Sequence, residues 1–265
     1  MPISLPIYSE SYRPSSDWVK SITQKQVTLE RLLPLDSILQ NKIEKYLLIK
    51  QITHNLQLSD INVGEKNINI LVEKEEYFDD SLAIVVKNFA SAIRYINTLV
   101  NNATDKSKVI LTSDLLRGLH ALIFSGIDQK AGFYRETPGK SLTPTHQPIE
   151  PDFLPIIVDN ALEWFNAESF RELHPLEQAW LVHLRVIDLQ PFEQGNSRLA
   201  RLVASLYAQR ANLFSIIVNA SEREFYTYAV NNALMMITQP GVELFARSVI
   251  QTYDEIFSII EQNKL

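Results

Sequence analysis

The stretch that decides the fold covers His183–Arg201 and reads HLRVIDLQPFEQGNSRLAR. Its first half is an apolar helical pattern that meets Pro191, and a proline pushes the residue before it out of helical geometry. Gly195 allows a sharp turn, and Asn196 or Ser197 can cap a following helix. The stretch therefore predicts two helices joined by a tight loop.

The start of the second helix has the chemistry of an anion-binding site. The first amides of a helix have no partner inside it and lie at the positive end of its dipole. Arg198 and Arg201 are three residues apart, so both lie on one face of the helix. Guanidinium groups bind phosphate oxygens in a bidentate manner. These features suit a diphosphate or triphosphate, and the alternative is that both arginines pair with acids on a neighbouring helix.

Helical periodicity continues on both sides of this stretch. Apolar residues recur at three- and four-residue spacing, which is the pattern of amphipathic helices. We expect helices at about 36–58, 80–101, 115–124, 152–166, 174–189, 196–211, 222–235 and 242–262. Only 7 of the 265 residues are glycine, and strands and hairpins use glycine at their turns. The sequence therefore indicates an all-α fold with short connections.

One long segment, from Ser125 to Pro155, departs from the helical pattern. It holds three of the 7 glycines and five of the 12 prolines. We interpret it as a loop that contains a short β-hairpin. Long irregular loops in compact domains are often functional, so Tyr134 and Arg135 within it are candidate site residues.

Composition and charge exclude several classes of function. The net charge of −6 and the pI near 5.5 argue against a nucleic-acid binder. The absence of cysteine excludes disulfides, thiolate nucleophiles and cysteine–zinc sites. No run reaches the about 18 apolar residues of a membrane span, and the first residues lack the pattern of a signal peptide. We therefore expect a cytoplasmic protein.

The His183–Arg201 stretch resembles the signature of the Fic domain family, H-x-F-x-(D/E)-G-N-G-R-x-x-R. Five signature residues match at the right spacing: Phe192, Gly195, Asn196, Arg198 and Arg201. Upstream, the segment Gly132–Arg135 resembles the start of the family's substrate-binding flap. The similar features extend from Leu111 to Tyr228 and follow one another in the family's order.

This resemblance implies an architecture and a set of ligands. The expected fold is a Fic-like helical bundle with a short β-hairpin flap that includes Tyr134 and Arg135. Residues 106–265 would form the Fic-like domain, and residues 1–105 a helical region packed on it. Family members typically move AMP from ATP to a protein hydroxyl, so ATP or another nucleotide and a protein target are the implied partners. The phosphate-binding residues would be Gly195, Asn196, Ser197, Arg198 and Arg201. The sequence leaves open whether the chain forms a homo-oligomer.

Two glutamines replace residues that run the family's chemistry. Gln190 stands where the family has the histidine that takes the proton from the attacking hydroxyl, and an amide cannot act as a base. Loss of a general base typically costs about 10²–10⁴ in rate. Gln194 stands where an acid holds magnesium, and a neutral amide oxygen holds Mg²⁺ less firmly. Of the neighbouring groups, Glu193 is expected to face another way, and His183 lies two helical turns away as a buried, hydrogen-bonded residue.

Two further departures concern the phosphate loop and its regulation. Ser197 replaces the second glycine of the signature, and its hydroxyl either crowds a phosphate or donates a hydrogen bond to it. Gln57, within Thr53–Leu58, stands at the glutamate of the family's inhibitory pattern (S/T)-x-x-x-E-(G/N), which pairs with the last signature arginine. A glutamine there could hydrogen-bond to Arg201 without the charge of a carboxylate. The alternative is a plain packing helix.

These observations are compatible with three functions. The first is a degenerate Fic-fold protein that binds a nucleotide or phosphate and has weak or absent AMP transfer. The second is an active transferase of a nucleotidyl or other phosphate-containing group, with Gln190 only orienting the acceptor hydroxyl. The third is a non-catalytic scaffold whose flap, Gly132–Pro148, presents an edge to an extended partner. We favour the first, because the phosphate-binding residues are present while glutamines replace the residues that take the proton and hold magnesium in the family.

Overall fold

The computed structural model describes residues 16–73 and 81–263, and every regular element within them is a helix. The α-helices are α1 (Ser16–Glu30), α2 (Ser37–Gln57), α3 (Glu65–Glu73), α4 (Ser81–Asn101), α5 (Ser113–Ile123), α6 (Leu154–Asn166), α7 (Glu168–Arg171), α8 (Pro175–Leu189), α9 (Asn196–Arg210), α10 (Arg223–Leu234) and α11 (Gln239–Gln262). Short 3₁₀ helices are η1 (Lys106–Lys108), η2 (Pro151–Phe153) and η3 (Ala220–Glu222). The all-α prediction is confirmed. None of the described helices combines the length and apolar character that crossing a membrane requires.

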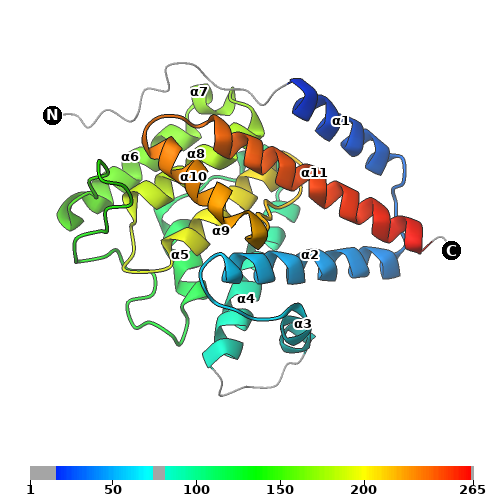
Figure 1. Cartoon of the computed structure of the whole chain (residues 1–265), viewed down its shortest axis with the longest axis horizontal. Coiled ribbons are helices and arrows are strands. Elements are labelled where there is room, and N and C mark those ends of the chain that lie inside the picture. The colour runs from blue at the N-terminus through cyan, green and yellow to red at the C-terminus, as the bar shows by residue number, and fades with distance from the viewer. Residues whose placement is uncertain (1–15, 74–80, 264–265) are drawn as a thin grey trace.

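Helices α8 and α9 form the centre of the molecule, with the other helices around them (Figure 1). They pack against each other more extensively than any other pair, and almost every residue of both is buried. Ala200, Ala204 and Ala208 recur at four-residue spacing in α9 and are fully buried. Small side chains at this spacing let neighbouring helices approach closely. The pair therefore fixes the loop between α8 and α9 at one end of the core.

The N-terminal helices pack on the outside of this core. Helix α1 lies along α11 (Figure 1), buries Ile22 and pairs Lys25 with Asp254. Helix α2 reaches the start of α9 with its C-terminal end, where Asn55 contacts Arg201. Helix α4 packs against α5 and α9. The predicted division of the chain at residues 105 and 106 stays a prediction.

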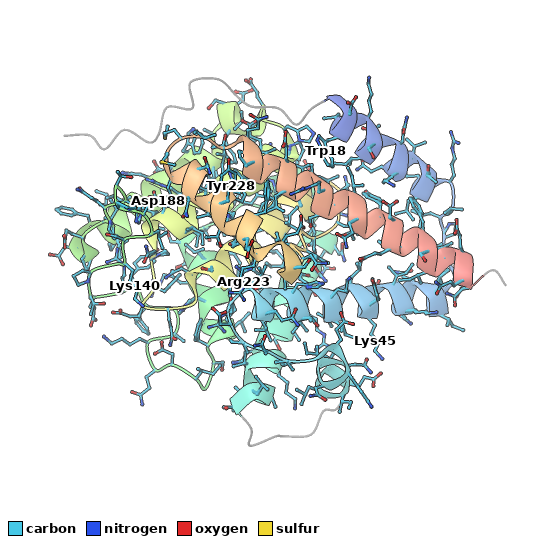
Figure 2. All side chains as sticks on the ribbon, viewed as in Figure 1. Trp18, Lys45, Lys140, Asp188, Arg223 and Tyr228 are labelled. Atoms are coloured by element: carbon cyan, nitrogen blue, oxygen red, sulfur yellow. The ribbon has the colours of Figure 1, made fainter. Side chains whose placement is uncertain are left out.

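The segment between α5 and η2 is irregular, and the predicted β-hairpin is wrong, because the described residues contain no strand. Its main-chain groups bond to side chains instead of to a partner strand. Lys140 N and O pair with the amide of Gln190, and Leu142 N donates to His146 Nδ1. Proline also removes the N–H donors that a ladder needs. Figure 2 shows Lys140 and Asp188 on the same side of the molecule, where this segment meets the end of α8.

Candidate functional site

The loop between α8 and α9 has a left-handed backbone at both ends. Gln190 has φ 42° and Gly195 has φ 75°. A Cβ on Gly195 would lie 2.1 Å from Phe124 Cε2, so glycine is required there for its missing side chain as well as for its backbone. Asn196 closes the loop, since its side chain donates to Phe192 O at 2.7 Å and accepts from Phe192 N at 3.0 Å.

The start of α9 has no side-chain cap, contrary to the expectation that Asn196 or Ser197 provides one. Gly195 is the residue before the helix, and the side chain of Asn196 is engaged with Phe192 instead. Among the described residues, no acceptor bonds to the main-chain N–H groups of Asn196, Ser197 or Arg198. Open amides at the positive end of a helix dipole form an anion-binding geometry.

A cavity of about 470 Å³ borders this helix start. One wall is the irregular segment from Arg135 to Leu142, and another is the end of α2 at Leu58–Asp60. The loop side is lined by Gln190, Phe192, Glu193, Gln194, Gly195, Asn196, Ser197 and Arg198. Ligand pockets typically measure about 300–1,000 Å³. Three larger cavities, of about 560, 710 and 960 Å³, lie elsewhere and do not border the loop.

Arg198 is buried at the edge of this cavity without a counter-ion. Its side chain is 9% exposed, and its guanidinium lies 4.5 Å from the centre of the Phe124 ring. No hydrogen bond or ion pair within the described residues involves its guanidinium. Burial, with the nearby charge of Arg201, lowers the pKa of Arg198 to about 10. Burying a charge without a partner is costly, so this side chain favours an anion as its ligand.

Arg201 is 2% exposed and is held by neutral oxygens. Its Nη2 donates to Asn55 O at 3.0 Å, to Asn55 Oδ1 at 2.9 Å and to Ser59 Oγ at 2.7 Å. Its Nη1 donates to the Tyr226 hydroxyl at 3.2 Å. The structure thus brings Arg198 to the cavity and fixes Arg201 behind it. Neither arginine pairs with an acid within the described residues, as the alternative reading of the sequence would require.

Within the described residues no hydrogen bond joins Gln57 to Arg201, and the expected regulatory role of Gln57 stays a prediction. The main-chain oxygen of Gln57 accepts from Arg223 instead. Asn55 and Ser59 lie one helical turn apart and share the face of α2 that meets Arg201. Gln57, two residues from each, is rotated by about 200° around the helix. The end of α2 does restrain the last signature arginine, but through other residues than the sequence pattern indicated.

His183 is fully buried and hydrogen-bonded, as expected. Its Nε2 lies 2.8 Å from the Tyr226 hydroxyl, and this same hydroxyl accepts from Arg201. Burial, followed by the charge of Arg201, lowers the pKa of His183 to about 3. A histidine with no path to the cavity and such a low pKa supports the structure of the core rather than proton transfer.

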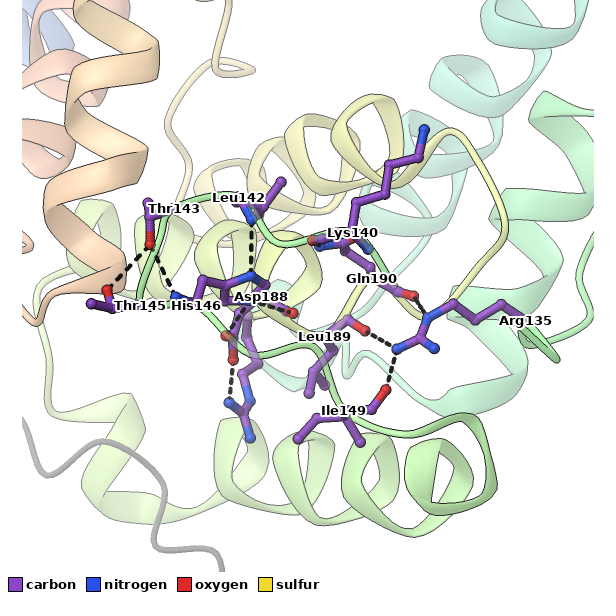
Figure 3. Close-up of polar contacts among 11 residues, drawn as sticks. Arg135, Lys140, Leu142, Thr143, Thr145, His146, Ile149, Asp188, Leu189 and Gln190 are labelled. Carbon is purple, nitrogen blue, oxygen red and sulfur yellow. Dashed lines mark hydrogen bonds and ion pairs between the residues drawn. The ribbon is translucent and has the colours of Figure 1, made fainter. Parts of the chain in front are cut away.

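Gln190 is engaged by the main chain of the irregular segment (Figure 3). Its Oε1 accepts from Lys140 N at 3.0 Å, and its Nε2 donates to Lys140 O at 2.6 Å. The side-chain amide therefore pairs with Lys140 as one peptide group pairs with another. This pairing uses one acceptor site of Oε1 and one N–H of Nε2, so half of the hydrogen-bonding capacity of the amide is taken by Lys140.

The residues at and beside the family's magnesium position are also engaged. Gln194 Nε2 donates to Asp128 Oδ2 at 3.0 Å. The Glu193 carboxylate accepts from Glu136 N at 3.1 Å and from Thr137 Oγ1 at 2.6 Å, and the Thr137 hydrogen bond is the main cause that lowers the pKa of Glu193. Glu193 thus faces the irregular segment, as expected.

The donors around the cavity do not fit a protein-held Mg²⁺ ion. Magnesium prefers carboxylate oxygens in octahedral geometry. Gln194 is neutral, Glu193 is engaged with Thr137, and Asp60 at the α2 end pairs with Arg223 at 2.8 Å. Within the described residues, no three histidine, aspartate or glutamate side chains are grouped to hold a metal ion.

The two candidate flap residues have different surroundings. Arg135 is 3% exposed, and its guanidinium forms hydrogen bonds to several main-chain oxygens. It donates to Gln190 O at 2.7 Å and to Ile149 O at 2.5 Å (Figure 3). It also donates to Thr137 O at 2.7 Å. Tyr134 is half-buried, and its ring centre lies 5.7 Å from the Arg117 guanidinium carbon. Arg135 therefore shapes the wall of the cavity, whereas Tyr134 packs behind it.

His120 is a site residue that the sequence did not reveal. Its Nδ1 accepts from Gly132 N at 2.9 Å, and its Nε2 lies 3.1 Å from Gln194 O. Its ring stacks on Phe192, with centres 3.8 Å apart, and on Phe124. Burial is the main cause that lowers the pKa of His120 to about 4. A single histidine in an apolar helix carries no spacing signal that could have identified this link.

Comparison with known proteins places this site in a recognised domain. Residues 110–208 match the family model described as the Fic/DOC family. The chain is 27% identical over 244 residues to a protein adenylyltransferase Fic of Culex quinquefasciatus, covering 88% of this chain and 46% of that protein. It is 27% identical over 163 residues to a protein adenylyltransferase Fic of Nematostella vectensis, covering 62% and 37%. The chain thus spans less than half the length of these curated relatives.

Solved structures show the same fold. A Fic domain containing signaling protein from Bacteroides thetaiotaomicron superposes with a TM-score of 0.80 at 19% identity, covering 91% of this chain and 98% of that one. Fic-1 from C. elegans superposes with a TM-score of 0.78 at 18% identity, covering 94% of this chain and 74% of that one. These similarities extend over the described helices well beyond residues 110–208.

Proposed function

We propose that this chain, whose residues 110–208 match the Fic/DOC family model, binds the phosphates of ATP or another nucleotide at the start of α9 and transfers AMP weakly or not at all. The observation that carries the proposal is Arg198. This arginine is nine-tenths buried, has no counter-ion within the described residues, and stands beside open helix amides at a cavity. A phosphate group satisfies both features at once, through bidentate hydrogen bonds and the helix dipole.

Weak or absent transfer is proposed because neither Gln190 nor the two histidines described near the loop, His120 and His183, is suited to accept a proton. Gln190 has no accessible pKa and its amide is bonded to Lys140. Both ring nitrogens of His120 are engaged, and His183 is sealed in the core. Without a base, about 10²–10⁴ in rate is lost. The poor fit of the donors to Mg²⁺ acts in the same direction.

Titration calorimetry with ATP and ADP, with and without Mg²⁺, tests the binding proposal. We expect measurable binding to the natural chain and at least tenfold weaker binding to Arg198→Ala, because about 1.4 kcal/mol is the least that a lost charged hydrogen bond should cost. Arg247→Ala is the matched control: Arg247 also stacks on a phenylalanine, at 4.6 Å from the Phe225 ring, but it pairs with Glu222 away from the loop. Absence of heat at millimolar nucleotide would remove the proposal and favour the scaffold.

An active transferase is the second candidate, supported by the similarity to protein adenylyltransferases. Positioning and electrostatic stabilisation carry much of phosphoryl-transfer catalysis, so a site without a base is slowed rather than silent. Incubation with ATP labelled in its AMP part and a cell lysate distinguishes the two. Strong protein labelling that disappears in Arg198→Ala would favour the transferase, and binding without labelling would favour the degenerate site.

A further inference from the structure

We propose that Gln190 is a latch that holds residues 137–142, called the strap below, across the cavity. The strap and the loop that carries Gln190 both line the cavity. The two are joined by the reciprocal hydrogen bonds between the Gln190 amide and Lys140 N and O (Figure 3). The effect on nucleotide exchange rests on the proposed function, whereas the latch itself does not.

The ends of the strap are held independently of Gln190. At its start, Thr137 Oγ1 donates to Glu193 at 2.6 Å, and Thr137 O accepts from Arg135. At its end, Leu142 N donates to His146 Nδ1 at 3.1 Å. Anchored ends leave the middle of the strap as the part that can move. Within the described residues, the hydrogen bonds that tie the main chain of this middle to the loop are those of Gln190.

The side chain of His146 is in turn fixed to the end of α8. Its Nε2 lies 3.3 Å from Asp188 Oδ1 and 3.2 Å from Asp188 O, and Asp188 Oδ2 accepts from Arg185 Nη1 at 2.6 Å. This network fixes the end of the strap to α8, the helix that ends one residue before Gln190. Opening at Lys140 therefore requires only that the latch breaks, because the supports on both sides stay in place.

The chemistry of the latch requires a primary amide. Pairing with both the N–H and the C=O of one residue needs an acceptor and a donor side by side in one plane, which glutamine supplies. A glutamate retains the acceptor for Lys140 N but turns a second oxygen toward Lys140 O. A histidine carries its donor and acceptor on separate sides of the ring. The glutamine that stands in place of the family's catalytic histidine at position 190 can therefore also hold the strap closed.

The latch links two properties of the site. While the amide pairs with Lys140, one of its N–H groups and one acceptor site are withdrawn from an acceptor hydroxyl, so the closed state opposes transfer. The strap also narrows the route by which a nucleotide reaches Arg198, since strap and loop line the same cavity. We therefore infer that breaking the Gln190–Lys140 pair precedes nucleotide binding and release.

Hydrogen exchange of the Lys140 amide, followed by NMR without nucleotide, tests the latch directly. We expect exchange to accelerate by about tenfold or more in Gln190→Ala, which removes the acceptor of the Lys140 N–H, a factor that corresponds to about 1.4 kcal/mol. In Gln190→Glu, which keeps that acceptor but repels Lys140 O, the acceleration should be smaller. Gln194→Glu is the charge-matched control, because its amide bonds to Asp128 rather than to the strap. Unchanged exchange in both position-190 variants would overturn the proposal, as would equal acceleration in the control.

A substitution on the strap tests the latch independently, so that the conclusion does not depend on the folding of the position-190 variants. A Cβ on Gly139 would lie 2.8 Å from Pro148 Cβ and 3.2 Å from Arg135 Nη2. Gly139→Ala should displace the strap and accelerate Lys140 exchange while leaving Gln190 intact. Amides inside α9 should keep their protection in all these variants. A strap that exchanges slowly in Gly139→Ala would count against a latch at its middle.

Stopped-flow binding of a fluorescent ATP analogue measures the consequence for the site. We expect association and dissociation rates to rise together, about fivefold or more, in Gln190→Ala, since a barrier is removed without loss of a phosphate contact. Faster Lys140 exchange with no analogue binding in any variant would refute the nucleotide site and leave the latch standing. Binding with unchanged rates despite faster exchange would refute the role of the strap in nucleotide exchange.

Discussion

Gly195 meets two requirements that other residue types do not. Its φ of 75° is left-handed, and a Cβ would overlap the Phe124 ring at 2.1 Å. We predict that Gly195→Ala lowers the free energy of unfolding by about 3 kcal/mol, from backbone strain and overpacking together. Urea unfolding measures this. Gly118→Ala is the matched control, because nothing lies within 4 Å of its Cβ in the middle of α5, and it should stabilise by about 0.5–1 kcal/mol. Equal stabilities of the two variants would contradict the packing argument.

His120 should make the stability depend on pH. Its pKa falls from the ordinary 6.5 to about 4 in the folded protein, so the unfolded chain binds the proton more readily. The contribution is complete above pH 6.5 and is lost as the pH falls toward 4. Between pH 7 and 4.5 this amounts to about 2 kcal/mol. His120→Phe keeps the aromatic stack, and its unfolding free energy should fall by about 2 kcal/mol less over this range. Parallel pH profiles of the two proteins would disprove the assignment.

The helices differ in how well their sequences reveal them. Helices α4, α8 and α9 carry long apolar stripes or clear end signals, and their predicted limits agree closely with the structure. Helix α1 was not predicted, because its composition is mostly polar and Ile22 is its one buried residue among those described. Packing against α11 stabilises it instead. The prediction of a hairpin was wrong for a different reason. In the turn-rich segment between α5 and η2, main-chain groups form hydrogen bonds to side chains rather than to a second strand.

Ile22 gives a test of this dependence of α1 on α11. We predict that Ile22→Ala costs about 2 kcal/mol, at the low end for a large-to-small change because the site is peripheral. Amides of α1 should then exchange faster while those of α8 and α9 stay protected, as hydrogen exchange can show. Val27→Ala, an exposed position of the same helix, should change stability by less than about 0.5 kcal/mol. Loss of protection throughout the core would refute a locally held α1.

At the scale of the whole molecule, the site joins residues that are far apart in the chain. Sequence reasoning located the phosphate loop because its residues are neighbours, with the required glycine and the two arginines at fixed spacing. It could not locate His120 beside Gln194, Asn55 beside Arg201 or Lys140 beside Gln190, which are separated by 74, 146 and 50 residues. These contacts depend on how helices pack. They decide which arginine faces the cavity and what Gln190 bonds to.

The absence of an ion pair to either Arg198 or Arg201 in the described residues has an electrostatic consequence. The chain as a whole carries a charge of −6, so from a distance it repels an anion. Near the loop, Arg201 is solvated by neutral oxygens and Arg198 by an aromatic face, and neither charge is cancelled. We expect the potential to become positive close to Arg198, within about the 8 Å over which salt screens charges in cells. Such a reversal favours small polyanions that diffuse inward over large ones that must first approach the acidic surface.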